Sequence, residues 1–156
     1  MKGNQNVIDA LNRLLASELT AMDQYFIHSR MYDDWGLAKL HERIAHEFED
    51  EKGHASALIE RILFLEGTPC MEKRDALRIG KDVPEMLRND LAVEYDVDKL
   101  LKDTIALCEK EQDFQTRRML GQLLEDTEVD HAWWLEKQLG LIDKVGLQNY
   151  LQSQMG

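Results

Sequence analysis

Residues 40–67, LHERIAHEFEDEKGHASALIERILFLEG, form an amphipathic helical pattern whose apolar stripe is interrupted by charged side chains. The final glycine, followed by Thr68 and Pro69, is a typical helix stop. The apolar positions that share one helix face are Leu40, Ile44, Leu58, Ile62 and Leu65. Between Ile44 and Leu58 this face carries Glu47, Glu51 and His54. Because an isolated buried carboxylate costs many kcal/mol, such a helix needs a compensating positive charge.

The rest of the chain also favours helix. Only nine Gly and two Pro occur in 156 residues, of which 44% are hydrophobic and 31% charged. One stripe runs from about Asn6 to the Asp33–Gly36 turn, a second lies in residues 40–67, and a third begins at an acidic N-cap, Asp82, with Pro84 in the first turn. After a weak break at residues 111–114, a fourth stripe continues to Gly140, and a short fifth helix is expected at about residues 143–151. We therefore predict an all-α chain.

The lengths of the connections predict the topology. Helices of about 25 to 30 residues span roughly 40 to 45 Å and can bury their stripes only against one another. The first and third connections are short and favour antiparallel hairpins, whereas some 16 residues, 66–81, join the second helix to the third and can travel the length of a bundle. We expect a single domain over residues 1–156: a four-helix bundle with one long crossover and a short fifth C-terminal helix.

All four stripes contain charged interruptions. They are Glu18 in the first, Glu51 and His54 in the second, Glu94 in the third, and Glu128 and His131 in the fourth. Two of these pairs form Glu-x-x-His, a spacing that places both side chains on one face of an α-helix. Glu18 and Glu94 are 76 residues apart, while Glu51 and Glu128, like His54 and His131, are 77 apart, so one hairpin with its ligands recurs in the second half.

This set matches the ligands of di-iron and di-manganese carboxylate bundles: a Glu from each of two helices and Glu-x-x-His from each of the other two. Two divalent ions would balance four carboxylates. A surface Glu or a satisfied core His explains any one of the six residues alone, but not all six in register. Oxygen-rich ligation with His suits iron or manganese better than structural zinc.

Charge and motifs exclude several classes of protein. The net charge of -11 disfavours a nucleic-acid partner, and no stretch is apolar enough to span a membrane. Residues 1–10 lack the apolar middle of a secretory signal, and Cys70 and Cys108 form no disulfide framework or CxxC motif. We expect a cytoplasmic protein. The roles of the two cysteines stay open.

Three segments resemble the bacterioferritins: LNRLLASELTAMDQYFIHSRMYDDWG (11–36), LIERILFLEGTP (58–69) and WLEKQLGLIDKVGLQNYLQSQ (134–154). The resemblance implies a ferritin-like subunit of a 24-copy cage that stores ferric mineral and has ferroxidase activity with O₂ or H₂O₂. It implies two irons per subunit, with Glu18 and Glu94 as terminal ligands, Glu51 and Glu128 as bridges, and His54 and His131 as one nitrogen ligand each. It also implies an inner-surface iron site at His46 and Asp50, for which a solvated helix face is an equal alternative. Tyr25 matches a family aromatic near the metal centre, although a core tyrosine fits its position equally well.

The chain departs from the family at residue 52. Bacterioferritins usually bind haem between two subunits through a Met after the second-helix ligand Glu, whereas this chain has Lys52, whose ammonium has no lone pair for iron. We therefore expect no haem b in homodimers. The chain resembles the subunit type that lacks the haem Met and can co-assemble with a haem-binding subunit.

The alternative function is a non-catalytic or haem-less assembly subunit of a mixed cage, which the complete ligand set disfavours. A DNA-protecting mini-ferritin is disfavoured because the chain lacks a basic tail, and a rubrerythrin-like peroxidase because it lacks CxxC. Manganese catalase remains a chemical rival. The oxidant, a ferredoxin-type reductant for iron release, and whether the cage is homo- or heteropolymeric stay open.

Overall fold

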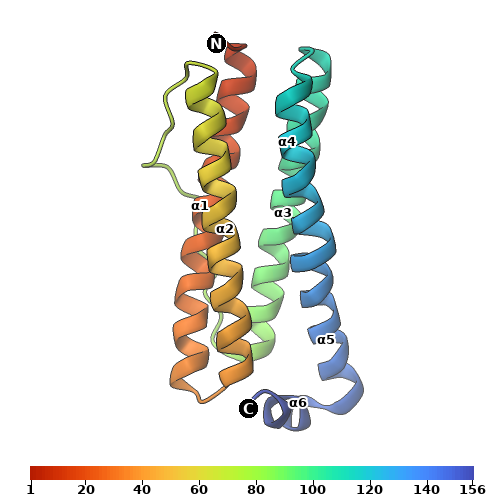
Figure 1. The fold of residues 1–156 in the computed structure, drawn as a ribbon. Coiled ribbons are helices and arrows are strands. Elements are labelled where there is room, and N and C mark those ends of the chain that lie inside the picture. Colours follow the sequence, from red (N-terminus) through yellow and green to blue (C-terminus); the bar gives the residue numbers. More distant parts are fainter.

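The computed structural model describes all 156 residues and contains helices but no strands. Four long helical rods form an antiparallel bundle with a short helix across one end (Figure 1). Their elements are α1 (Gln5–Asp34), α2 (Ala38–Phe64), α3 (Val83–Lys110), α4 (Phe114–Glu125), the π-helix η1 (Asp126–Ala132), α5 (Trp133–Val145) and the terminal α6 (Leu147–Ser153). The predicted all-α bundle with a fifth short helix is confirmed.

The helix starts follow from local capping. The side chain of Asn4 accepts hydrogen bonds from the backbone N–H groups of Asn6 and Val7 at the start of α1. Asp82 accepts from the N–H of Glu85, with Pro84 in the first turn of α3, as the sequence predicts. Asp113 caps α4 through the N–H of Thr116.

The connection between α2 and α3 has no regular structure and runs the length of the bundle, so that α2 and α3 point the same way (Figure 1). It is fastened to α1 by polar contacts: the side chain of Asn12 accepts from the N–H of Cys70 at 2.8 Å, and Thr20 Oγ1 accepts from the N–H of Asp75 at 2.7 Å. The expected long crossover is therefore present.

The fourth rod differs from the prediction in two ways. It does not end at Gly140 but continues to Val145, because one helical glycine costs only about 1 kcal/mol and Leu139 and Ile142 still pack against the core. Gly146, with φ of 84°, ends it and turns the chain into α6. The rod also contains seven π-helical residues between α4 and α5, which the periodicity of the sequence did not predict.

One continuous apolar core of 27 buried residues links the four rods. Val7, Leu11, Leu58 and Leu101 are fully buried within it. Both cysteines are free, Cys108 being buried and Cys70 half-buried. No helix is both long and apolar enough to cross a membrane. The polar site described next interrupts this core near the middle of the bundle.

Candidate di-metal site

Five of the six predicted ligands meet between the four rods. They are Glu18 from α1, Glu51 and His54 from α2, Glu94 from α3 and His131 from the π-helix. Exposure of Glu18 and Glu94 is 0%, and that of Glu51 and His131 is 1%, so the cluster lies inside the bundle. Chain positions as distant as 18 and 131 converge because each rod turns the polar interruption of its stripe inward.

The five residues form two triplets that share Glu51. One triplet is Glu18, Glu51 and His54, with His54 Nδ1 2.8 Å from Glu18 Oε2 and 3.5 Å from Glu51 Oε2. The other is Glu51, Glu94 and His131, with His131 Nδ1 3.0 Å from Glu51 Oε1 and 3.4 Å from Glu94 Oε1. Each triplet therefore offers one nitrogen, one carboxylate of its own and one oxygen of a shared carboxylate.

Both histidines present Nδ1 to the cluster and Nε2 to an outer carboxylate. His54 Nε2 lies 3.0 Å from Asp126 Oδ2, and His131 Nε2 lies 3.1 Å from Asp50 Oδ2. Metal-binding histidines characteristically donate their second ring N–H to such a carboxylate, which fixes the tautomer and the ring orientation. The imidazole rings are stacked, with their centroids 5.9 Å apart.

The sixth predicted ligand, Glu128, does not join the cluster. Its side chain is 45% exposed, and its Oε1 lies 2.8 Å from the ammonium of Lys102 on α3. The expectation that Glu128 shares a face with His131 is wrong because the i, i+3 rule applies to α-helices. In a segment with i→i+5 bonds, the residues nearest in angle to His131 are four and five positions back. These are Thr127, which is fully buried, and Asp126, which contacts His54.

The spacing of the internal repeat explains the π-helix. The ends of α1 and α3, Asp34 and Lys110, are 76 residues apart, as are the starts of α2 and α4, Ala38 and Phe114. Asp50 and Asp126, which hold the two histidines from outside, keep this spacing. His54 and His131 are 77 apart, so the second half contains one additional residue between Asp126 and His131. A one-residue insertion in a helix is accommodated as a π-bulge. Here it returns His131 to the site but leaves Thr127, not Glu128, at the repeat position that corresponds to Glu51.

Burial and mutual charge control the protonation of the acids. Burial, and next the charge of Glu51, raise the pKa of Glu18 to about 8. Burial likewise raises the pKa of Glu94. Burial and the charge of Glu94 oppose ionisation of Glu51, but contacts with His131 and His54 outweigh them and lower its pKa. Of the three acids, Glu51 is therefore the one whose surroundings favour the ionised form.

The same contacts favour protonated histidines. Burial opposes the charge of His54, but hydrogen bonds to Glu18 and Glu51 raise its pKa to about 11. Burial also opposes the charge of His131, but contacts with Asp50, Glu47 and Glu51 raise its pKa far above the ordinary value. Protons thus supply, in the metal-free protein, the positive charge that the buried acids need.

Several ligand atoms have no hydrogen-bond partner. They are Glu18 Oε1, Glu51 Oε2, Glu94 Oε2 and His131 Nδ1, all shielded from solvent. His131 Nδ1 lies 3.0 Å from Glu51 Oε1 as an ion-pair contact, without the geometry of a hydrogen bond. Buried polar atoms are normally paired, and leaving one unpaired costs roughly 1–3 kcal/mol. The two triplets thus combine unpaired carboxylate oxygens with imidazole nitrogens, a donor set that fits a pair of divalent cations such as iron or manganese.

Three other predicted residues occupy distinct positions. Tyr25 is buried and its hydroxyl donates to Glu94, next to the cluster; burial and then the charge of Glu94 raise its pKa well above the ordinary value. His46 is 61% exposed and lies 3.5 Å from Asp50 on the same helix. Lys52 is 64% exposed, turned away from the cluster, and paired with Glu49 at 3.3 Å.

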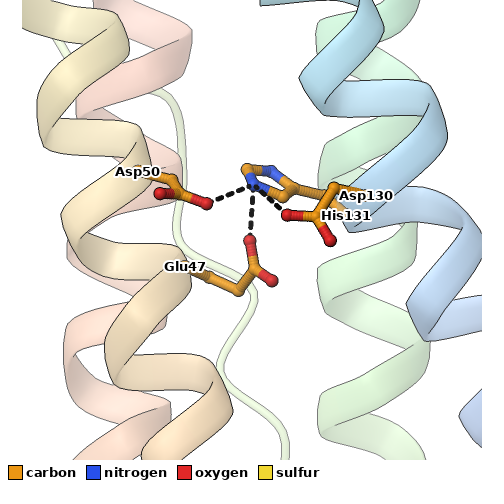
Figure 2. A group of neighbouring side chains, drawn as sticks. All are labelled: Glu47, Asp50, Asp130 and His131. Carbon is orange, nitrogen blue, oxygen red and sulfur yellow. Dashed lines mark hydrogen bonds and ion pairs between the residues drawn. The ribbon is translucent and has the colours of Figure 1, made fainter.

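A second group of acids surrounds the outer side of His131. Glu47 and Asp50 of α2 and Asp130 of the π-helix converge on its ring (Figure 2). Glu47 Oε2 lies 2.5 Å from His131 Nε2, so Glu47 supports a predicted ligand. The sequence marked Glu47 as a polar interruption without a role, and it missed Asp126 and Asp130. The 76-residue spacing of Asp50 and Asp126 was the available signal.

Comparisons with known proteins agree with this architecture. A family model described as a ferritin-like domain matches residues 8–145. The chain is 63% identical to a bacterial ferritin of Synechocystis over 155 residues, covering 99% of both chains. It is 58% identical to a bacterial ferritin of Pseudomonas aeruginosa over 99% of this chain and 100% of the relative, and 43% identical to a bacterioferritin of Mycobacterium avium over 96% and 94%. Together with the helical bundle and its buried carboxylate and histidine cluster, these matches show that the chain belongs to the ferritin family, among the bacterial ferritins.

Proposed function

We propose that the chain is an iron-storage cage subunit with ferroxidase activity at the buried cluster. Two Fe²⁺ ions bind as substrates, are oxidised by O₂ or H₂O₂, and leave as Fe³⁺ for deposition in the cavity of the cage. The observation that carries this proposal is the pair of buried ligand triplets joined by Glu51, whose carboxylates each keep an oxygen atom without a hydrogen-bond partner. A non-catalytic assembly subunit would not need two ligand triplets joined by one carboxylate.

The residues divide the work in a defined way. Glu18 with His54, and Glu94 with His131, each hold one ion, and Glu51 bridges the two. Oxidation raises the charge on each iron by one, and buried carboxylates stabilise that charge more strongly than water-exposed ones. Two Fe²⁺ supply two electrons, which reduce O₂ to H₂O₂, or H₂O₂ to water, as two protons are taken up. Asp50 and Asp126 keep the histidine rings oriented throughout.

Glu128 is outside the proposed ligand set in this conformation. The repeat position that corresponds to Glu51 is occupied by Thr127, whose hydroxyl donates to the carbonyl oxygen of Leu123 at 2.9 Å. The proposal therefore differs from the resemblance-based ligand set by one carboxylate. His46, with Asp50, remains a proposed iron site on the way to the cavity, and Lys52 supports the proposal that homodimers do not bind haem.

Rapid mixing tests the proposed activity. The assembled protein receives two Fe²⁺ per subunit anaerobically and is then mixed with O₂, while the ferric absorbance is followed. Glu51→Ala should abolish the fast phase because it removes a ligand from both ions. Glu49→Ala, a substitution on an exposed neighbour in the same helix, should leave it unchanged. Absence of a fast phase in the wild type would favour a non-catalytic subunit of a mixed cage, and a fast phase that survives Glu51→Ala would show that oxidation takes place outside this cluster.

Glu128→Ala separates the five-residue set from the six-residue set. The Glu128–Lys102 pair is exposed, and screening by solvent makes such a pair contribute little to stability. We expect near wild-type oxidation by this variant. Loss of the fast phase equal to that of Glu51→Ala would show that Glu128 enters the site when iron binds.

A further inference from the structure

Arg43 on α2 connects that helix to the π-helix. Its Nε donates to Glu47 Oε1 at 2.6 Å, and its Nη2 donates to Asp130 Oδ1 at 2.8 Å. The guanidinium also lies 4.8 Å from the centre of the Trp134 ring, a cation–π distance. Three contacts in different directions fix this side chain, which is only 26% exposed.

The two carboxylates that Arg43 binds both have their other oxygen near His131. Glu47 Oε2 lies 2.5 Å, and Asp130 Oδ2 4.0 Å, from His131 Nε2 (Figure 2). Glu47 is 98% buried, so its charge requires a close partner, and Arg43 supplies it. Arg43 is thus linked to His131 through a single intervening carboxylate, and the Nδ1 of His131 faces Glu51 and Glu94.

His131 has a particular need for such support. It comes from a π-helix, which packs against α3 and its own flanking helices, so α2 holds the segment mainly through side chains. His54, by contrast, comes from the regular helix α2. The residue that corresponds to Arg43 in the 76-residue repeat is Met119, which cannot form ion pairs. The guanidinium bridge is therefore present only on the side where the ligand comes from the π-helix.

We propose that Arg43 is a positioning residue: through Glu47 and Asp130 it holds the π-helix against α2 and orients His131 for the half-site with Glu51 and Glu94. This role rests on the proposed metal-binding function. Arginine suits this role better than lysine, because a planar guanidinium binds two carboxylates at once in fixed directions, whereas an ammonium is a compact point charge.

Anaerobic titration with Co²⁺ tests the role without depending on oxidation. The assembled wild-type protein should bind two Co²⁺ per subunit in the cluster. Binding is monitored by the d–d absorption of the bound Co²⁺. In Arg43→Met, the ion held by His54 should bind as before, while the ion held by His131 should bind roughly 10- to 100-fold more weakly, the usual effect of removing an outer support. Arg43→Lys should restore part of the loss. Arg30→Met is the control, since Arg30 is exposed and stacks on Phe26 at 5.2 Å.

A double-mutant cycle assigns the weakened site. Arg43→Met should add nothing to His131→Ala but should add its full effect to His54→Ala. Two unchanged sites in Arg43→Met, or equal weakening of both, would overturn the positioning role. If Arg43→Met does not assemble, Arg43→Lys is combined with His131→Ala and with His54→Ala instead. Its smaller effect should again add nothing to His131→Ala and add fully to His54→Ala. Absence of paired Co²⁺ binding in the wild type would instead overturn the site itself, and this role with it.

Discussion

Metal loading of the cluster should release protons, and their number follows from the structure. In the metal-free protein the pKa of Glu18 is about 8 and that of His54 about 11, and that of His131 is raised as well. All three groups therefore hold a proton at about pH 6.5. A metal ion binds only the deprotonated atoms, so filling both half-sites should expel about three protons per subunit.

The sign and size of the pH dependence follow from this count. Each released proton makes the overall binding constant rise roughly tenfold per pH unit, or about 1.4 kcal/mol. With three protons, the constant for filling both half-sites should rise roughly a thousandfold between about pH 6 and pH 7. The rise becomes shallower above pH 8, where Glu18 is already ionised.

Calorimetry measures the proton count directly. Co²⁺ is titrated into the metal-free assembly at about pH 6.5 in buffers of different ionisation enthalpy, and the slope of the observed enthalpy against that of the buffer gives the protons released. Glu18→Gln should lower the count by about one, while Glu49→Gln, on an exposed residue, should not. Release of one proton or none by the wild type would refute the protonation states assigned to the cluster.

Further predictions concern the π-helix, the haem position, the inner surface and the core. Deletion of Thr127 removes the additional residue of the second half, so the π-helix should become α-helical and place Glu128 in the cluster; a crystal structure with Co²⁺ bound would show Glu128 as a ligand, and an unchanged π-helix would contradict this explanation. Lys52→Met should enable the assembly to bind haem, seen as a Soret band absent from the parent, and a stoichiometric band in the parent would contradict the proposed role of Lys52. His46→Ala should slow the later mineral growth but leave the first turnover intact, since His46 is 61% exposed and is not one of the five clustered residues; equal loss of both phases would count against a separate surface site. Leu58→Ala, at a fully buried position, should lower the free energy of unfolding by about 2–5 kcal/mol in chemical denaturation, and a change below about 1 kcal/mol would show that this part of the core collapses around the vacancy.

The sequence predicted most of the fold because helical stripes and capping residues are local signals. Asp82 and Pro84 start a helix wherever the chain places them, and the apolar stripes leave only one way to bury long helices. The prediction that the fourth rod ends at Gly140 is wrong because glycine is a common helix stop in a sequence. Only the packing of Leu139 and Ile142 against the core shows that the helix continues.

The sequence by itself predicted the types of the proposed ligands and the inward position of four of the six: Glu18, Glu51, His54 and Glu94 lie on regular α-helices, where spacing along the chain determines the face. Only the tertiary structure showed that His131 enters the cluster and that Glu128 does not. One additional residue can be absorbed anywhere along a helix, and the place is chosen by packing against neighbouring helices, not by local propensity. Here contacts with α2 and α3 turned His131 inward and left Glu128 with Lys102. The 77-residue spacing between His54 and His131 indicates the insertion, but which side chain it turns toward the cluster depends on how the helices pack.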